Sequence, residues 1–235
     1  MPGRVTSRGG RALPAPPSEV ARDAPANLVV LGASWGGLHA VGHILAHLTA
    51  TMRCPILVAQ HRARAGESLL AALLQDLTSR SVRDAVDGEP LAQDTVRIAP
   101  PDRHLLVGGG RLALSTSRPV RYSRPSIDVT FTAAAEAYGP ALIAVVLTGA
   151  NNDGARGARL AADRGGRVIV QDPRSAEVGT MPEAAIRQLG GAPRSRWRVV
   201  PLAGIAPTIA ALVRPGPDPA IADDPGPGAP PTATV

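Results

Sequence analysis

The chain has 235 residues, of which 44% are hydrophobic and 2% aromatic, enough for one sizeable domain whose core is built from Ala, Val, Leu and Ile. Its net charge of +6 suggests nucleic-acid binding, but the chain has no run of basic residues and almost no aromatic side chains for base stacking, so we expect no nucleic-acid partner. The single cysteine, Cys54, excludes an internal disulfide, and no apolar run reaches the roughly 20 residues of a membrane-spanning helix, so we expect no membrane insertion.

The two ends of the chain differ from its middle. Residues 1–25 are rich in Pro, Gly, Ser and Arg, residues 214–235 are rich in Pro and Gly, and neither segment has hydrophobic periodicity. We expect both to be disordered, because neither can bury a core. The first segment also lacks the apolar stretch of a signal peptide. The sequence therefore predicts a cytoplasmic protein with one folded domain at residues 26–213.

The middle of the chain alternates short apolar runs with helical patterns. The predicted strands are Leu28–Leu31, Ile56–Gln60, Thr95–Ala99, His104–Val107, Arg111–Ser115, Ala141–Leu147 and Val168–Gln171. The predicted helices are roughly Leu38–Leu48, Glu67–Leu77, Val129–Tyr138, Gly154–Arg164 and Pro182–Leu189. Several strands are apolar throughout, which is typical of a parallel sheet with both faces covered. The sequence thus predicts an α/β fold: a doubly wound, mostly parallel sheet with helices on both faces, and a small antiparallel hairpin insertion in residues 95–117.

A glycine-rich turn, GASWGG at residues 32–37, follows the first predicted strand. It does not match the G-x-G-x-x-G of dinucleotide-binding turns, the next strand ends in Gln60-His61 instead of an acidic residue, and a Walker loop needs a lysine that this chain lacks. The turn does match G-x-S-x-G, whose glycines allow a sharp bend that exposes Ser34 beside N–H groups able to bind an oxyanion. A structural serine fits the turn equally well, so Ser34 needs a base and an acid.

The positions of the five histidines in the sequence predict different roles for them. Three of them, His39, His43 and His47, recur every four residues on the first predicted helix, on the sector opposite its apolar side. They are predicted to face solvent, and no metal site is expected. The fourth, His104, lies in the predicted hairpin and is assigned a structural role. The fifth, His61, directly follows a predicted strand and should lie beside the serine turn, which makes it the candidate base.

The candidate acid is Asp153, in a Gly-Ala-Asn-Asn-Asp-Gly turn that follows the predicted strand Ala141–Leu147. Asp153 or Asn152 would serve equally well as the N-cap of the next helix. If Asn152 takes the cap, Asp153 is free to orient His61. The resulting chain order of serine, histidine and aspartate differs from the serine, acid, histidine order of α/β-hydrolases, so the α/β-hydrolase fold is disfavoured.

Seven segments occur in the order seen in bacterial chemotaxis protein-glutamate methylesterases of the CheB type: LGASWGG, VAQHRA, DAVDGEPL, RIAPPDRHLLV, RPSIDVTF, VVLTGANNDGARG and GTMPEAAI. The chain resembles this family over residues 27–202. The resemblance implies Ser34 as nucleophile, His61 as general base and Asp153 as the acid that orients it. It further implies hydrolysis of glutamate methyl esters on the cytoplasmic helices of chemoreceptors, with deamidation of selected glutamines as a second reaction and no cofactor.

The chain departs from the family's pattern at three points. Trp35 stands where family members usually carry a small residue, and Ala150 where they usually carry Met; both positions, together with Gly36, belong to the expected oxyanion and substrate pocket. The segment before the domain is also too short for the family's receiver domain, which implies a constitutively open enzyme or a separate response-regulator protein. A catalytically weakened domain that binds a signalling partner is the main alternative, and a nucleotide-binding regulator is a weaker one.

Overall fold

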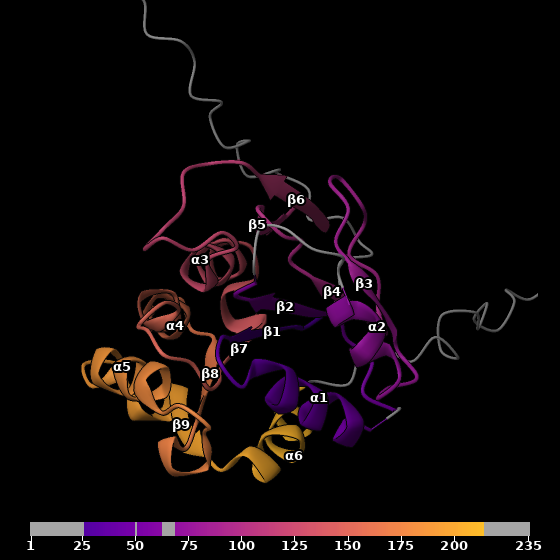
Figure 1. Cartoon of the computed structure of the whole chain (residues 1–235). Helices are drawn as coiled ribbons and strands as arrows, with labels where there is room; N and C mark the ends of the chain where they lie inside the picture. Colours follow the sequence, from indigo (N-terminus) through magenta and orange to yellow (C-terminus); the bar gives the residue numbers. More distant parts are fainter. Residues whose placement is uncertain (1–25, 50, 63–68, 214–235) are drawn as a thin grey trace, which may run out of the picture.

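The fold is built on one large β-sheet. The computed structural model describes residues 26–49, 51–62 and 69–213. Seven parallel strands lie in the order β3-β4-β2-β1-β7-β8-β9, and β5 and β6 form a separate antiparallel pair (Figure 1). The strands are β1 (Leu28–Ala33), β2 (Ile56–Gln60), β3 (Ser81–Asp84), β4 (Thr95–Ile98), β5 (His104–Gly108), β6 (Arg111–Ser115), β7 (Leu142–Val146), β8 (Arg167–Gln171) and β9 (Trp197–Val200). The predicted doubly wound fold is confirmed.

Helices cover both faces of this sheet (Figure 1). They are α1 (Gly37–His47), α2 (Leu69–Gln75), α3 (Ile127–Tyr138), α4 (Ala155–Asp163), α5 (Thr180–Leu189) and α6 (Leu202–Leu212). One core lies under α3, α4 and α5, and the other lies under α1, α2 and α6. Successive residues of β1 point alternately into the two cores, with Leu28 and Val30 in one and Val29 and Leu31 in the other. Burial on both faces is the reason that this strand is apolar throughout.

The strand order reverses at β1. The chain passes outward through β2 to β3 and β4, then returns to the other side of β1 with β7. Ala33 pairs with Gln60, and Gly32 pairs with Val146, so β1, β2 and β7 end at one level. Ligand and catalytic groups of doubly wound sheets gather at such a reversal. The loops that follow these three strands therefore lie together at one edge of the sheet.

Gly32 allows α3 to pack directly on β1. A Cβ atom at this position would lie 2.4 Å from Cγ2 of Ile127 and 2.9 Å from Cζ of Phe131. Both side chains are fully buried. The contact holds the first turns of α3 against the strand that leads into the serine turn.

One strand was predicted in the wrong place, and some elements of the structure were not predicted. The hairpin insertion is confirmed for β5 and β6 only, because Thr95–Ile98 is buried and joins the main sheet as β4. The edge strands β3 and β9 were not predicted, since each is four residues long with exposed polar or charged side chains. Helix α6 was missed because Pro207 interrupts its pattern. The predicted disordered ends lie outside the described residues.

Candidate active site

Ser34 and His61 are positioned by the ends of β1 and β2. The Ser34 N–H donates to the Thr148 carbonyl at 3.0 Å, and the His61 N–H donates to the Ala33 carbonyl at 3.1 Å. These bonds extend the ladders of the sheet into the two loops. They leave the Ser34 Oγ 3.0 Å from Nδ1 of His61.

Asp153 contacts the other nitrogen of the same ring. Its Oδ2 lies 2.8 Å from Nε2 of His61. If the ring carries its proton on Nε2, that N–H donates to the carboxylate and Nδ1 turns its lone pair toward the Ser34 hydroxyl, which is the state that a general base requires. The Asn151 amide nitrogen also lies 3.4 Å from Nδ1. The structure thus brings together the three residues that the sequence singled out.

The Asp153 carboxylate is fully buried at the N-terminus of α3. Besides His61, it accepts hydrogen bonds from the Ile127 N–H at 2.7 Å, the Asp128 N–H at 2.9 Å, the Ser126 hydroxyl at 3.0 Å and the Gly154 N–H at 3.0 Å. Burial by itself would raise the pKa of this carboxyl group, but the hydrogen bonds from His61 and from the α3 backbone outweigh it and hold the pKa below its ordinary value. The acid is therefore ionised at neutral pH.

The prediction that Asn152 caps the following helix was wrong. Helix α4 starts after Gly154, and the Gly157 N–H of its first turn donates to Asp128 Oδ1 at 2.9 Å. Asn152 instead accepts a hydrogen bond from Arg121. Asp153 serves a different helix: a carboxylate at the N-terminus of α3 binds its free N–H groups and complements its dipole. One side chain therefore both binds the N-terminus of α3 and contacts His61, whereas the sequence analysis weighed Asp153 only as a cap of the next helix, α4, or as the acid.

Ser126 and His104 form a supporting layer that the sequence analysis did not assign to the site. The fully buried Ser126 caps α3 and donates its hydroxyl to Asp153. Its N–H donates to Nδ1 of His104 at 3.2 Å, and Nε2 of His104 lies 3.3 Å from the Arg118 carbonyl. The structural role predicted for His104 agrees with these contacts. A serine just before a helical pattern is an N-cap signal, and that signal would have found Ser126.

The predicted oxyanion pocket lies at the start of α1. The Trp35 N–H directly follows Ser34 in the chain, next to the positive end of the helix dipole. The Trp35 side chain is 66% exposed, and its Nε1 donates to Glu177 at 2.8 Å. Ala150 is exposed. The apolar group packed on this turn is the buried Met181: a Cβ on Gly149 would lie 2.9 Å from both its sulfur and Cβ of Ser34.

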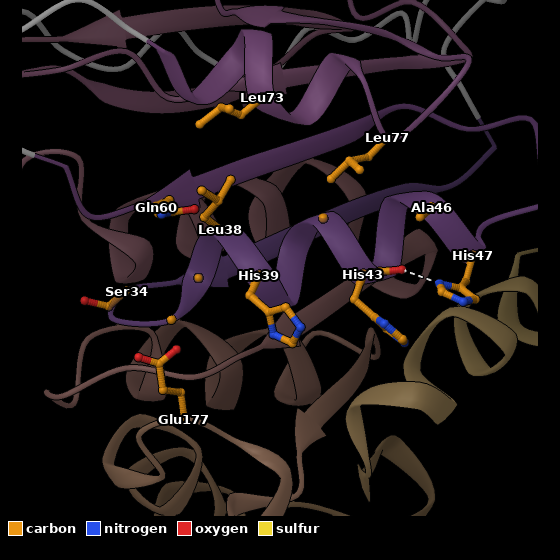
Figure 2. Close-up of a pocket in the computed structure, with 13 residues that line it drawn as sticks. Ser34, Leu38, His39, His43, Ala46, His47, Gln60, Leu73, Leu77 and Glu177 are labelled. Atoms are coloured by element: carbon orange, nitrogen blue, oxygen red, sulfur yellow. Dashed lines mark hydrogen bonds between the residues drawn. The ribbon is translucent and has the colours of Figure 1, made fainter.

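A groove that follows α1 begins beside Ser34 (Figure 2). Gln60 and Glu177 lie with Ser34 at one end of it. The histidines of α1 also line this groove, away from the sheet, as their spacing predicted. Among the described residues no cluster of His, Cys, Asp or Glu could hold a metal ion, and no described helix is long and apolar enough to cross a membrane.

A hydrogen-bonded serine, histidine and aspartate at the strand ends of a parallel sheet is the arrangement of a serine hydrolase. The family model of the CheB methylesterase matches residues 29–209. The chain belongs to this family.

Known relatives agree with the family assignment. A putative protein-glutamate methylesterase/protein-glutamine glutaminase of Leptospira interrogans is 38% identical over 159 residues, covering 67% of this chain and 82% of the relative. The protein-glutamate methylesterase FrzG of Myxococcus xanthus is 40% identical over 176 residues, covering 73% of this chain and 53% of FrzG. The crystal structure of the Thermotoga maritima CheB methylesterase catalytic domain matches with a TM-score of 0.73 and 34% identity, covering 80% of this chain and 98% of that domain.

Proposed function

We propose that this chain is a protein-glutamate methylesterase in which Ser34 is the nucleophile, His61 the general base and Asp153 the orienting acid. The observation that carries the proposal is the unbroken hydrogen-bond chain from Ser34 Oγ to His61 at 3.0 Å and from His61 to Asp153 at 2.8 Å. Membership of the CheB methylesterase family supports the choice of a glutamate methyl ester as substrate.

The proposed reaction is a two-step acyl transfer. Ser34 Oγ attacks the ester carbonyl while Nδ1 of His61 takes its proton, and the Trp35 N–H helps to bind the oxyanion. The tetrahedral intermediate then collapses: the bond to the methoxy group breaks, and His61 returns the proton so that methanol leaves. Water attacks the acyl-enzyme by the same route and releases the free glutamate. Ionised Asp153 stabilises the imidazolium that forms in each step.

The proposed substrate is a methylated chemoreceptor or a receptor-like signalling protein. The Leptospira relative is named for both methylesterase and glutaminase activity. Deamidation of a glutamine uses the same acyl-enzyme, with ammonia as the leaving group in place of methanol. The alternative of a catalytically weakened binding module is not favoured, because Trp35 and Ala150 leave the three-residue chain intact.

The test is methanol release from methyl-labelled chemoreceptor membranes. We expect release by the native chain and none by Ser34→Ala. Ser115→Ala is the matched control, since this serine hydrogen-bonds only Ser117 among side chains of the described residues. Absence of release by a folded native chain would contradict the proposal and favour the binding module.

A further inference from the structure

Two side chains of the described residues contact Nδ1 of His61, the nitrogen that carries the proton in the proposed reaction. Ser34 Oγ lies 3.0 Å from it, and the amide nitrogen of Asn151 lies 3.4 Å from it. The proposed reaction uses the first contact and gives the second no role. Asn151 is half-buried in the turn that carries Asp153, and the described residues offer its amide nitrogen no other hydrogen bond.

The orientation of the Asn151 amide follows from its own turn. Its Oδ1 accepts a hydrogen bond from the Asp153 N–H at 3.0 Å, which closes an Asx turn. If the amide were flipped, its own N–H groups would meet that N–H, donor against donor. Nδ2 is therefore the atom directed at His61. Its contact of 3.4 Å is longer than the usual range of about 2.7–3.2 Å, so this donor is only weakly engaged in the resting protein.

The leaving group of the proposed reaction must occupy the space beside the same ring nitrogen. His61 gives its Nδ1 proton to the leaving atom, so in the tetrahedral intermediate that atom lies within about 3 Å of Nδ1. The oxyanion is a different substituent of the same carbon and is assigned to the Trp35 N–H. A donor 3.4 Å from Nδ1 is thus placed to reach the leaving atom and not the oxyanion.

The two proposed substrates, a glutamate methyl ester and a glutamine, differ at the leaving atom. The methoxy oxygen carries lone pairs and no hydrogen, so it can take the proton from His61 and also accept a hydrogen bond from Asn151. In the intermediate formed from a glutamine, the leaving nitrogen uses its lone pair for the proton, and its hydrogens are donors. Those donors would meet the donor N–H groups of Asn151. A site discriminates against a substrate that leaves donors unpaired.

We propose that Asn151 selects methyl esters over glutamines by donating a hydrogen bond from Nδ2 to the leaving methoxy oxygen. This inference rests on the function proposed above. Ser34 Oγ first bonds to the ester carbon, and its proton passes to Nδ1 of His61. Nδ1 then gives that proton to the methoxy oxygen, the carbon–oxygen bond breaks with its electron pair on that oxygen, and methanol leaves. Hydrolysis of the acyl-enzyme is the same for both substrates, so the selection precedes it.

The experiment measures kcat/KM for both leaving groups on one receptor. Methyl-labelled chemoreceptor membranes report methanol release, and the same receptor with glutamine at the methylated positions reports ammonia release. Because kcat/KM covers only the steps up to departure of the leaving group, the shared hydrolysis of the acyl-enzyme does not enter. For Asn151→Ala we expect kcat/KM to fall about tenfold for the ester and not to fall for the glutamine, so the ester-to-glutamine ratio should fall at least about tenfold.

A third substrate separates the leaving atom from the oxyanion. p-Nitrophenolate is stable enough to leave without a proton, so p-nitrophenyl acetate gains little from a donor at its leaving oxygen, yet it forms the same kind of oxyanion. Its hydrolysis by Asn151→Ala should stay within about twofold of that by the native chain. Equal losses for p-nitrophenyl acetate and the methyl ester would assign Asn151 to the oxyanion or to the fold of the site and overturn the proposal.

Two further variants control for the turn itself. Asn151→Ser keeps a side-chain oxygen for the Asp153 N–H but has no amide to reach His61, so its ratio should change as in Asn151→Ala. A native ratio in Asn151→Ser would assign the effect to the turn and overturn the proposal. Asn152→Ala is the matched control, since this exposed neighbour hydrogen-bonds Arg121, and it should keep the native ratio.

The outcomes separate this inference from the proposed function. If the native chain hydrolyses the ester in a Ser34-dependent way and Asn151→Ala keeps the native ratio, the proposed function stands and the inference is wrong. Where ammonia release is too slow to measure, the ratio of methyl ester to p-nitrophenyl acetate tests the same donor. If the native chain releases no methanol, both the inference and the proposed function are overturned.

Discussion

The two sides of His61 and Ser34 are built differently. On the side of α3, the Asp153 carboxylate is fully buried and accepts five hydrogen bonds, three of them from the backbone. On the side of α1, Ser34 lies at one end of an open groove lined by Leu38, Leu73 and Leu77, which are two-fifths to one-half exposed. In the proposed reaction, the first side fixes the direction of the proton transfer. The second side presents a partly exposed apolar surface.

Under the proposed function, this contrast separates the chemistry of the site from recognition of the substrate. Orientation of His61 depends on buried groups that cannot be changed singly without leaving a donor unpaired. Selection of the substrate depends on exposed groups that can change at little cost to stability. Trp35 and Ala150, the departures from the family's pattern, are exposed and belong to the second kind. Four predictions test the contrast.

Asp153→Asn should have the largest effect. The donors around Asp153 contact both of its carboxylate oxygens, whereas the asparagine amide has a single acceptor oxygen. The neutral amide also cannot stabilise the imidazolium of His61, so we expect kcat for an ester to fall by about 10³–10⁴-fold. The measurement is steady-state hydrolysis of p-nitrophenyl acetate. Asp163→Asn, at an exposed position of α4 paired with Arg159, should stay near native activity. A loss below about tenfold would show that the buried side does not control catalysis.

Gly32→Ala should destabilise the fold without touching a catalytic group. Its methyl group would press on Ile127 and Phe131 at 2.4 and 2.9 Å, so we expect the free energy of unfolding to fall by about 1–3 kcal/mol. Urea denaturation measures this quantity. Gly108→Ala is the matched control, because a Cβ there meets nothing within 4 Å. Equal stability of the two variants would contradict the tight packing of α3 on β1.

His104 should make stability depend on pH. Burial lowers the pKa of His104 more than its hydrogen bond to the Arg118 carbonyl raises it. The unfolded chain takes up this proton as the pH falls through about 6.5, whereas the folded chain does so only at lower pH. The contribution of His104 to stability is therefore complete above pH ~6.5 and lost below it, with a slope of up to about 1.4 kcal/mol per pH unit.

Urea denaturation between pH 7 and 5 measures this slope. His104→Asn keeps an acceptor for the Ser126 N–H but does not titrate, so its slope should be flatter than that of the native chain. Thr116→Asn, at an exposed position that carries no titratable group, is the control and should keep the native slope. Identical slopes in all three proteins would remove His104 as the cause.

Glu177→Ala should have the smallest effect on stability. It removes the hydrogen bond from the Trp35 indole between two exposed side chains, so the free energy of unfolding should change by less than about 0.5 kcal/mol. Glu183→Ala, at an exposed position of α5, is the control. A loss of several kcal/mol would mean that the exposed side is as tightly coupled to the fold as the buried side.

The parts of the site predicted from sequence share one physical origin. Ser34 and His61 each follow an apolar strand, and parallel strands end at one level, so local patterns sufficed to place them together. The partners of Asp153 were not predictable in this way. Ser126 and Ile127 contact it across 27 and 26 positions of chain, through the packing of α3 on the sheet. Glu177 likewise reaches Trp35 only through the tertiary fold, over 142 positions.

The hydrogen bonds from Ile127 and Asp128 to Asp153 also make two backbone amides reporters of the state of the site. Each amide proton can exchange with solvent only when the Asp153 carboxylate releases it. Release of the carboxylate at the same time loosens its bond to His61. The deuterium exchange rates of these two amides in the resting protein therefore measure how often the site comes apart between turnovers.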